Sequence, residues 1–219
     1  MYQALKLKYP NEDIPGERTV YRIMEEIGLS HRPNRNARKS DDLLKRNFTA
    51  QRPLEKCVTD ITKIPAQDGK LYVSAIFDYY DLGVLRLSMS DNMRVELCIS
   101  TIENAFKAFP SINGAIIHSD RGSQYTSASY RAELNQCGIV QSMNSDGKRC
   151  HDNAHCETMW ARMKEELLYG RYDTKKELKT LIWRYFIIYW KNRRICSTNG
   201  GLPPMLKRKQ YYESLGQAA

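Results

Sequence analysis

Hydrophobic and polar positions in the middle of the chain follow a pattern that predicts β-strands first and helices afterwards. Residues 57–62, 71–77 and 83–88 are short runs rich in β-branched, leucine and aromatic side chains. Short turn segments that contain aspartate and glycine separate these runs. Because both connections are short, the three runs predict an antiparallel three-strand meander.

A helix is expected after the meander, because apolar residues recur every three or four positions between residues 98 and 109. Asp91 or Asn92 is its expected N-cap, since short polar side chains satisfy the free N–H groups of a first turn. Pro110 is expected to end it, because proline cannot continue a helix.

A strand, a helix and a short strand complete this region. The apolar run 115–118 predicts a buried strand, residues 127–137 predict a helix closed by Gly138, and residues 139–141 predict the last strand. Three strands, helix, strand, helix, strand is the order of the ribonuclease-H-like fold. We therefore expect an α/β fold with a mixed five-stranded sheet flanked by helices.

Two short helices are predicted at the start of the chain. Residues 2–9 and 17–27 have helical patterns, and Gly28 is placed to cap the second helix. Residues 1–29 therefore predict a partial helix-turn-helix DNA-binding arm or, equally, a helical hairpin that packs on the main domain.

Residues 30–53 lose this periodicity and are interpreted as a basic linker. Only Asp41 and Asp42 oppose its cations, so the segment is either a solvated connector or a track for a phosphate backbone. Residues 54–219 are then the main domain with a C-terminal helical extension. The seven linker cations are Arg32, Arg35, Arg38, Lys39, Lys45, Arg46 and Arg52.

A long amphipathic helix is predicted over residues 175–194. Thr174 and Glu177 have the spacing of a capping box at its start. Its basic end, with Lys191, Arg193 and Arg194, is a candidate phosphate contact or a plain solvated helix terminus. The expected buried stripe is Leu178, Leu181, Ile182, Tyr185 and Tyr189.

Composition narrows the class of protein. The chain has 219 residues, 42% of them hydrophobic and 27% charged, which is typical of a globular domain, and no apolar run approaches the roughly 20 residues of a membrane span. The N-terminus lacks the pattern of a signal peptide, so we expect a cytoplasmic protein whose six cysteines are thiols. A net charge of +9 and a pI near 9.2 favour nucleic acid as the partner.

Three carboxylates stand where such a fold could bring them together. Asp60 is on the first predicted strand, Asp120 follows the fourth strand and precedes a Gly/Ser turn, and Glu157 is on a later helix. Lys164 lies two helical turns after Glu157 on almost the same side of that helix. Carboxylates in this arrangement hold hard cations against a phosphodiester. The buried stripe expected for the helix is Cys156, Met159, Trp160, Met163 and Leu167.

Several segments, in this order, resemble the B-frame transposases of bacterial insertion sequences, in the IS3 family and its IS150-like group. These enzymes have a retroviral-integrase-like catalytic core. The resemblance runs from the first helices to the C-terminus. The segments that carry it are residues 58–62, 118–127, 138–143, 152–157 with Lys164 and Glu166, 189–194 and 201–204.

The resemblance implies a DDE-type transposase that cuts and joins DNA at the terminal inverted repeats of an insertion sequence. Asp60, Asp120 and Glu157 are then the catalytic residues and the ligands of two Mg²⁺ ions, with Mn²⁺ as a substitute. The implied partners are double-stranded element ends and target DNA, a second copy of the chain on that DNA, and the product of an upstream reading frame. The expected DNA contacts are Lys164, Arg121, Lys191, Arg193 and Arg194.

Three features depart from the family pattern. Residues 144–151 are one residue longer than usual, which we expect to be a loop insertion that leaves the following helix in place. Cys57 stands near the start of the first strand, where the family often has tryptophan. The chain also enters the helix-turn-helix region partway, so we expect a shortened copy.

Other interpretations stay open. The chain could be a non-catalytic DNA-binding remnant of a transposase, or a nuclease of the same fold. Asp78 could be a fourth ligand, although a turn aspartate is the favoured interpretation. A zinc cluster is a further alternative, made of Cys150, His151, His155 and Cys156.

Overall fold

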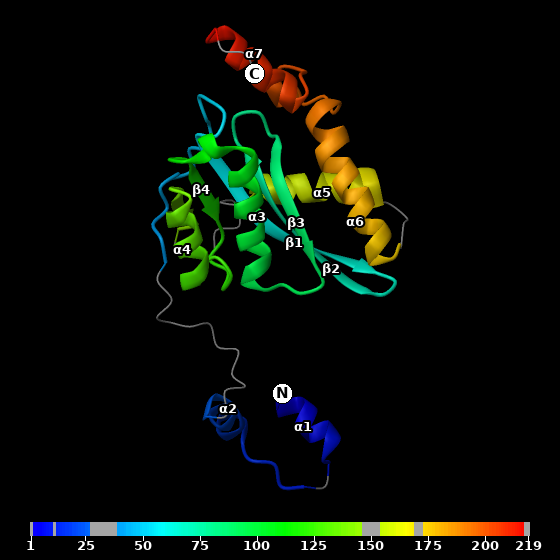
Figure 1. The fold of residues 1–219 in the computed structure, drawn as a ribbon. Helices are drawn as coiled ribbons and strands as arrows, with labels where there is room; N and C mark the ends of the chain where they lie inside the picture. Colours follow the sequence, from blue (N-terminus) through cyan, green and yellow to red (C-terminus); the bar gives the residue numbers. More distant parts are fainter. Residues whose placement is uncertain (1, 11, 27–38, 146–153, 169–172, 217–219) are drawn as a thin grey trace. The chain divides into compact units, whose positions relative to one another are not determined.

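The computed structural model describes residues 2–10, 12–26, 39–145, 154–168 and 173–216 (Figure 1). The chain divides into two compact units, Met1–Ala37 and Arg38–Ala219. The first unit contains α1 (Tyr2–Lys8) and α2 (Glu17–Glu26), so both predicted N-terminal helices are confirmed. The cap expected at Gly28 lies outside the described residues.

The second unit is built on a five-stranded sheet with the strand order β3-β2-β1-β4-β5. The first three strands form the predicted antiparallel meander, β4 is parallel to β1, and β5 is parallel to β4, so the predicted mixed sheet is confirmed. The strands are β1 (Lys56–Ala66), β2 (Gly69–Asp78), β3 (Val84–Ser90), β4 (Ile116–Ser119) and β5 (Val140–Met143).

Strand β1 continues four residues beyond its predicted end at residue 62. Proline is unusual in the middle of a sheet, and Pro65 concealed this extension in the sequence. In the structure, Pro65 lies opposite Lys70, in a long hairpin that turns at Gly69 with a φ of +129°. Glycine adopts this backbone conformation without steric cost.

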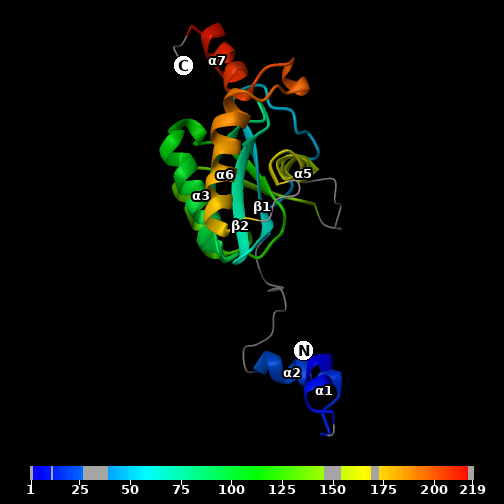
Figure 2. The ribbon, with the colours of Figure 1, turned by 90° about the vertical axis from the view of Figure 1, so that its right-hand side faces the viewer.

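Helices cover both faces of the sheet (Figure 2). Side chains of α3 (Val95–Ala108) and α4 (Ala128–Gln136) share one core cluster with Cys57 of β1. Side chains of α5 (Ala154–Leu168) and α6 (Lys175–Trp183) share the other cluster with Val58. Because neighbouring residues of a strand point to opposite faces, β1 contributes to both clusters.

The predicted N-cap of α3 is wrong. Arg94 occupies the cap position without a side-chain hydrogen bond, because β3 continues to Ser90 and the connection after it is extended. Asp91 instead accepts hydrogen bonds from the ammonium groups of Lys175 (2.7 Å) and Lys179 (3.4 Å), which ties this connection to the start of α6. The helix ends at Ala108, as the position of Pro110 predicted within two residues.

The long C-terminal helix has the predicted capping box at Thr174 and Glu177, but it changes its winding. After α6, the segment η3 (Arg184–Trp190) is a π-helix, which has more residues per turn than an α-helix. The sequence predicted Tyr189 as the last buried residue of this helix. In the structure Trp190 is buried instead, and Tyr189 is 42% exposed. The other buried residues spaced by four are Leu178, Ile182 and Phe186.

The second half of the predicted linker is part of the second unit. Leu44 is only 3% exposed and joins the core cluster that includes Val58. The backbone N–H of Leu43 donates to Ser142 Oγ (3.0 Å), and that of Met143 donates to the carbonyl of Asp41 (3.2 Å). The prediction of a linker over residues 30–53 rested on charge and overlooked these apolar positions. The second unit begins at Arg38, within the predicted linker.

A buried ion network fastens the C-terminal helix α7 (Pro204–Ser214) to the turn between β2 and β3. Arg208 donates from Nη2 to Asp78 Oδ2 (2.8 Å) and from Nε to Asp81 Oδ2 (2.6 Å). Asp78 also accepts from the N–H groups of Leu54 (2.7 Å) and Tyr80 (2.9 Å). Asp78 is therefore the turn aspartate that the sequence favoured, and it is fully committed to protein donors.

Two further observations complete the fold. Across the described ranges, no helix is both long enough and apolar enough to cross a membrane. The five described cysteines are buried free thiols, at positions 57, 98, 137, 156 and 196, as predicted.

The ion network generates a stability prediction. Arg208→Met keeps the packing volume but leaves Asp78 and Asp81 buried without their cation. We expect the free energy of unfolding to fall by about 3–5 kcal/mol, as measured by urea denaturation. The matched control is Lys209→Met on the same helix, because Lys209 is exposed and should lose little. Equal stability of both variants would contradict a structural role for Arg208.

Candidate active site

Parallel pairing of β1 and β4 brings the first two carboxylates together. The register pairs Lys56 with Ile116 and Val58 with His118, an offset of 60 positions in each pair. The pairing ends two residues before Asp60 and Asp120, and the charge of Asp120 raises the pKa of Asp60, so the two carboxylates lie near each other. Asp60 comes from β1, and Asp120 comes from the turn that directly follows the neighbouring strand β4.

The turn after β4 orients Asp120. The backbone N–H of Gly122 donates to Asp120 Oδ1 (2.9 Å), and a Cβ atom on Gly122 would lie only 3.0 Å from that oxygen. A larger side chain at position 122 would therefore crowd the carboxylate. Arg121 is held against the end of β5, because its Nε donates to the carbonyl of Asn144 (2.5 Å).

His118 fixes the same end of the sheet from inside. Its ring is buried, with Nδ1 hydrogen-bonded to Ser142 Oγ (2.9 Å) and Nε2 to Asn144 Oδ1 (2.8 Å). These bonds join β4 to the end of β5, two residues before Asp120. Sequence reasoning assigned no role to His118, although a histidine in an otherwise apolar strand was the signal for one.

Helix α5 carries the third carboxylate and is attached to the first. Glu157 is exposed in the first turn of α5, and Trp160 is buried three residues later. Trp160 Nε1 donates to Asp60 Oδ2 (3.2 Å), while its ring packs edge-on against Phe77 and Phe186. The predicted stripe assigned Trp160 to the core alone and missed this contact with Asp60.

The three carboxylates share one electrostatic environment. Burial, together with the negative charges of Asp120 and Glu157, raises the pKa of Asp60 to about 6, against the lowering effects of hydrogen bonds from the Ile61 backbone and Trp160. A cation near these oxygens would reverse this effect, and carboxylate oxygens are the donors that Mg²⁺ prefers. The donor types therefore fit a divalent metal.

The carboxylates are nevertheless not drawn together around a common centre. Among the residues that the structure describes, no three His, Cys, Asp or Glu side chains are close enough to hold a metal ion. Of the four residues in the zinc alternative, Cys150 and His151 lie outside the described residues. His155 instead packs its ring against Tyr79 at 5.1 Å, and burial lowers its pKa.

The cations predicted to contact DNA do not share one environment. Lys164 and Arg193 are exposed, whereas Lys191 is only 8% exposed and lies 5.5 Å from the centre of the Phe109 ring. Lys191 is therefore a buried cation, whereas its neighbour Arg193 is exposed. Arg194 is paired with Glu166 (2.6 Å) and stacks over Trp190 at 4.4 Å.

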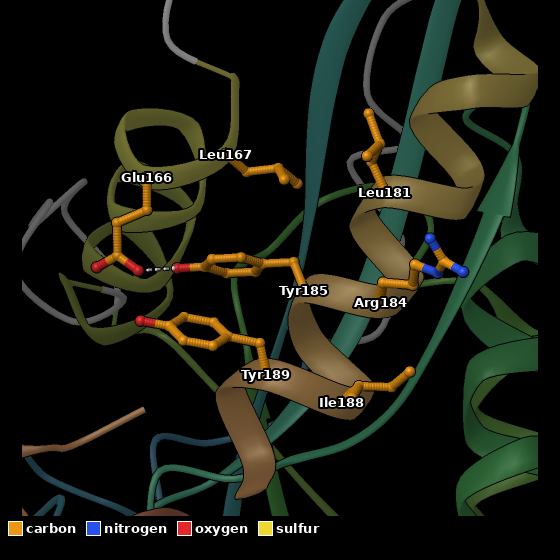
Figure 3. A pocket seen from close by; sticks show the side chains of 7 residues that line it. All are labelled: Glu166, Leu167, Leu181, Arg184, Tyr185, Ile188 and Tyr189. Carbon is orange, nitrogen blue, oxygen red and sulfur yellow. Dashed lines mark hydrogen bonds between the residues drawn. The ribbon is translucent and has the colours of Figure 1, made fainter. Parts of the chain in front are cut away.

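Glu166 lies on the rim of a cavity of about 670 Å³ between α5 and the helix formed by α6 and η3. Figure 3 shows its carboxylate pointing toward Tyr185, whose hydroxyl donates to Oε2 (2.7 Å). None of the three carboxylates lines this cavity, so it is separate from the candidate active site. The other lining residues are Leu167, Leu181, Arg184, Ile188 and Tyr189.

Comparison with known proteins defines the class first. The family model for the integrase core domain matches residues 50–149. The catalytic core domain of HTLV-2 integrase, solved in complex with magnesium, has a TM-score of 0.52 at 15% identity and covers 73% of this chain and 99% of that one. The second unit therefore has the ribonuclease-H-like fold of an integrase catalytic core, as predicted.

Sequence relatives then define the family. An uncharacterized transposase-like protein of Haemophilus influenzae is 34% identical over 203 residues, which cover 87% of this chain and 92% of that protein. The putative transposase InsK of insertion sequence element IS150 from Escherichia coli is 35% identical over 172 residues, which cover 78% of this chain. The chain belongs to the bacterial insertion-sequence transposases of the IS3 group. It spans only 60% of the length of InsK.

The raised pKa of Asp60 predicts a stability cost for keeping the active-site charges together. Below the ordinary pKa of 3.8 the carboxyl is protonated in both states, and as pH rises toward 6 only the unfolded state loses the proton, so stability falls. Asp60→Asn should therefore raise the free energy of unfolding at pH 7.5 by roughly 3 kcal/mol in metal-free buffer, with no gain below about pH 4.

The measurement is urea unfolding of both proteins across this pH range. Asp91→Asn is the control, because Asp91 is exposed and paired with Lys175 and Lys179, and it should give no gain. An Asp60→Asn variant that is no more stable than the wild type at pH 7.5 would show that Asp60 carries no such penalty.

Proposed function

We propose that this chain is a DDE-type transposase that cleaves DNA strands at insertion-sequence ends and joins them to target DNA. The observation that carries the proposal is that β1 and β4 pair up to two residues before Asp60 and Asp120, and that the charges of Asp120 and Glu157 raise the pKa of Asp60. Membership of the insertion-sequence transposases supports the choice of DNA as the substrate.

The reaction proposed for this site is an in-line displacement at phosphorus. A water molecule first attacks the phosphodiester at the element end, forming a new P–O bond as the bond to the leaving 3′-oxygen breaks. The freed 3′-hydroxyl then attacks a phosphodiester of the target, forming a new P–O bond as the bond to the target's own 3′-oxygen breaks. The attacking hydroxyl loses its proton to solvent, and the released target 3′-oxygen takes up a proton from solvent. The number of phosphodiester bonds is conserved in this second step, so no external energy source is needed.

Asp60, Asp120 and Glu157 are the proposed catalytic residues and the proposed ligands of two Mg²⁺ ions, with Mn²⁺ as a substitute. Such ions would supply Lewis-acid stabilisation of the attacking and leaving oxygens. The chain's own groups hold the carboxylates in position. Trp160 orients Asp60 through its indole N–H, and the Gly122 N–H orients Asp120.

DNA is proposed to lie along the exposed flank of α5. Glu157 and Lys164 are both exposed and lie two helical turns apart on that flank, so a strand held by the Lys164 ammonium would pass the carboxylates. Arg121 and Arg193 are further proposed contacts. The proposed partners are the terminal inverted repeats, the target duplex, a second copy of this chain and the product of an upstream reading frame.

The proposal predicts that each carboxylate is essential for joining. Asp60→Ala, Asp120→Ala and Glu157→Ala should each reduce strand transfer by more than about 100-fold and leave duplex binding largely intact, because metal ligands matter more than the groups that support them. The assay mixes the full chain with Mg²⁺ and a labelled element-end duplex and measures nicked and joined products separately.

The matched control is Glu165→Ala, because Glu165 is an exposed carboxylate on the same helix and should keep full activity. Joining by any of the three carboxylate variants would overturn the assignment. Nicking without joining by the wild type would indicate a nuclease of the same fold, and binding alone would indicate a non-catalytic remnant.

A further inference from the structure

Three cationic side chains surround the ring of Phe109, and none of them belongs to the candidate active site. Arg86 lies on β3, Lys191 follows η3, and Arg208 lies on α7. Their charged groups are 5.4, 5.5 and 5.4 Å from the ring centre, respectively. We call these three side chains the Phe109 cation cluster. A ring has two faces, so at least two of the cations approach it from the same side.

The acidic groups near the cluster do not balance its charge. Asp78 and Asp81 each pair with Arg208. Within the described part of the chain, neither Arg86 nor Lys191 has a carboxylate within 4 Å. Arg86 donates from Nη1 to the carbonyl of its neighbour Leu85 (2.9 Å), which is a neutral acceptor. The cluster therefore contains three cations and only two counter-charges.

Burial makes this imbalance costly. Arg208 is only 4% exposed, and its Nη1 is buried with no hydrogen-bond partner. Lys191 is buried to a similar degree, and its desolvation together with the charges of Arg86 and Arg208 lowers its pKa to about 8. An aromatic ring attracts cations, but weakly in comparison with the loss of hydration, so the ring alone leaves Arg208 Nη1 unsatisfied.

We propose that the Phe109 cation cluster binds a phosphate oxyanion. A tetrahedral phosphate offers several oxygens at once, which suits a guanidinium fork together with an ammonium point charge. Bound there, it would supply the missing negative charge and an acceptor for the free N–H groups of Arg208. A carboxylate offers only two oxygens in one plane, fewer acceptors than these three side chains can use.

The site is separate from the carboxylates and reaches the surface. Arg86 and Phe109 are half-buried, so an anion can approach them from solvent. Arg86 belongs to β3, the edge strand, and β2 and β1 separate β3 from β4, which precedes Asp120. Phosphate could come from a DNA backbone that passes this edge or from free inorganic phosphate, and both sources share the same recognition chemistry.

The first test uses inorganic phosphate on the full chain without DNA. Replacing chloride by about 20 mM phosphate at equal ionic strength should raise Tm by about 3 °C, because a ligand of the folded state stabilises it by mass action. Lys191→Met should lose most of this rise. Lys209→Met, an exposed lysine beside Arg208, should keep it.

Without phosphate, Lys191→Met should have a Tm at least equal to that of the wild type, because methionine fills the space and removes an unbalanced charge. This result distinguishes an anion site from a purely structural lysine, whose loss would lower Tm. A wild-type Tm that rises no more in phosphate than in chloride would overturn the proposal. So would an equal rise in Lys191→Met.

A second test identifies the source of the phosphate and rests on the proposed function. Affinity for an element-end duplex is measured over a range of salt concentrations. If the cluster holds a backbone phosphate, Lys191→Met should reduce the slope of log K against log salt by about 0.9 relative to Lys209→Met. An unchanged slope with the phosphate response lost assigns the site to free phosphate. Because the first test uses no DNA, it can succeed even if the chain joins no strands.

Discussion

The parallel pairing of β1 with β4 at the centre of the sheet is the constraint on which the site depends. The two strands are separated along the chain by β2, β3 and α3, yet they pair up to two residues before Asp60 and Asp120. A shift of one residue would turn one side chain toward the opposite face of the sheet. Packing on both faces of β1 fixes the register, because Cys57 and Val58 are fully buried in different core clusters.

Side-chain contacts hold α5 and α7 to the sheet. Trp160 of α5 donates a hydrogen bond to Asp60 of β1. This bond holds α5, the helix that carries Glu157, against the strand that carries Asp60. Arg208 joins α7 to the β2–β3 turn through two buried carboxylates. The C-terminal extension is thus part of the core unit, and its Lys191 and Arg208 are buried beside Phe109.

Element order was predictable from the sequence, but several boundaries and contacts were not. Alternating apolar patterns report which face of an element is buried, and they predicted the five strands in their correct order along the chain. The end of β1 was missed because proline is disfavoured inside strands, and the sequence does not show that Pro65 lies near the turn of a long hairpin. In the π-helical segment, Trp190 is buried in place of the predicted Tyr189. Asp91 does not cap α3 but forms ion pairs with two lysines of α6, more than 80 positions away.

The sequence by itself determined the family and the fold and singled out three carboxylates as candidates, because long motifs and apolar periodicity are local properties of the chain. Tertiary structure alone decided what surrounds them: the bond from Trp160 to Asp60, the buried imidazole of His118 and the cluster of cations at Phe109. The physical reason is desolvation. A lysine or tryptophan has the same identity in any sequence, but its charge and its hydrogen bonds acquire their energies only from the neighbours that exclude water from it.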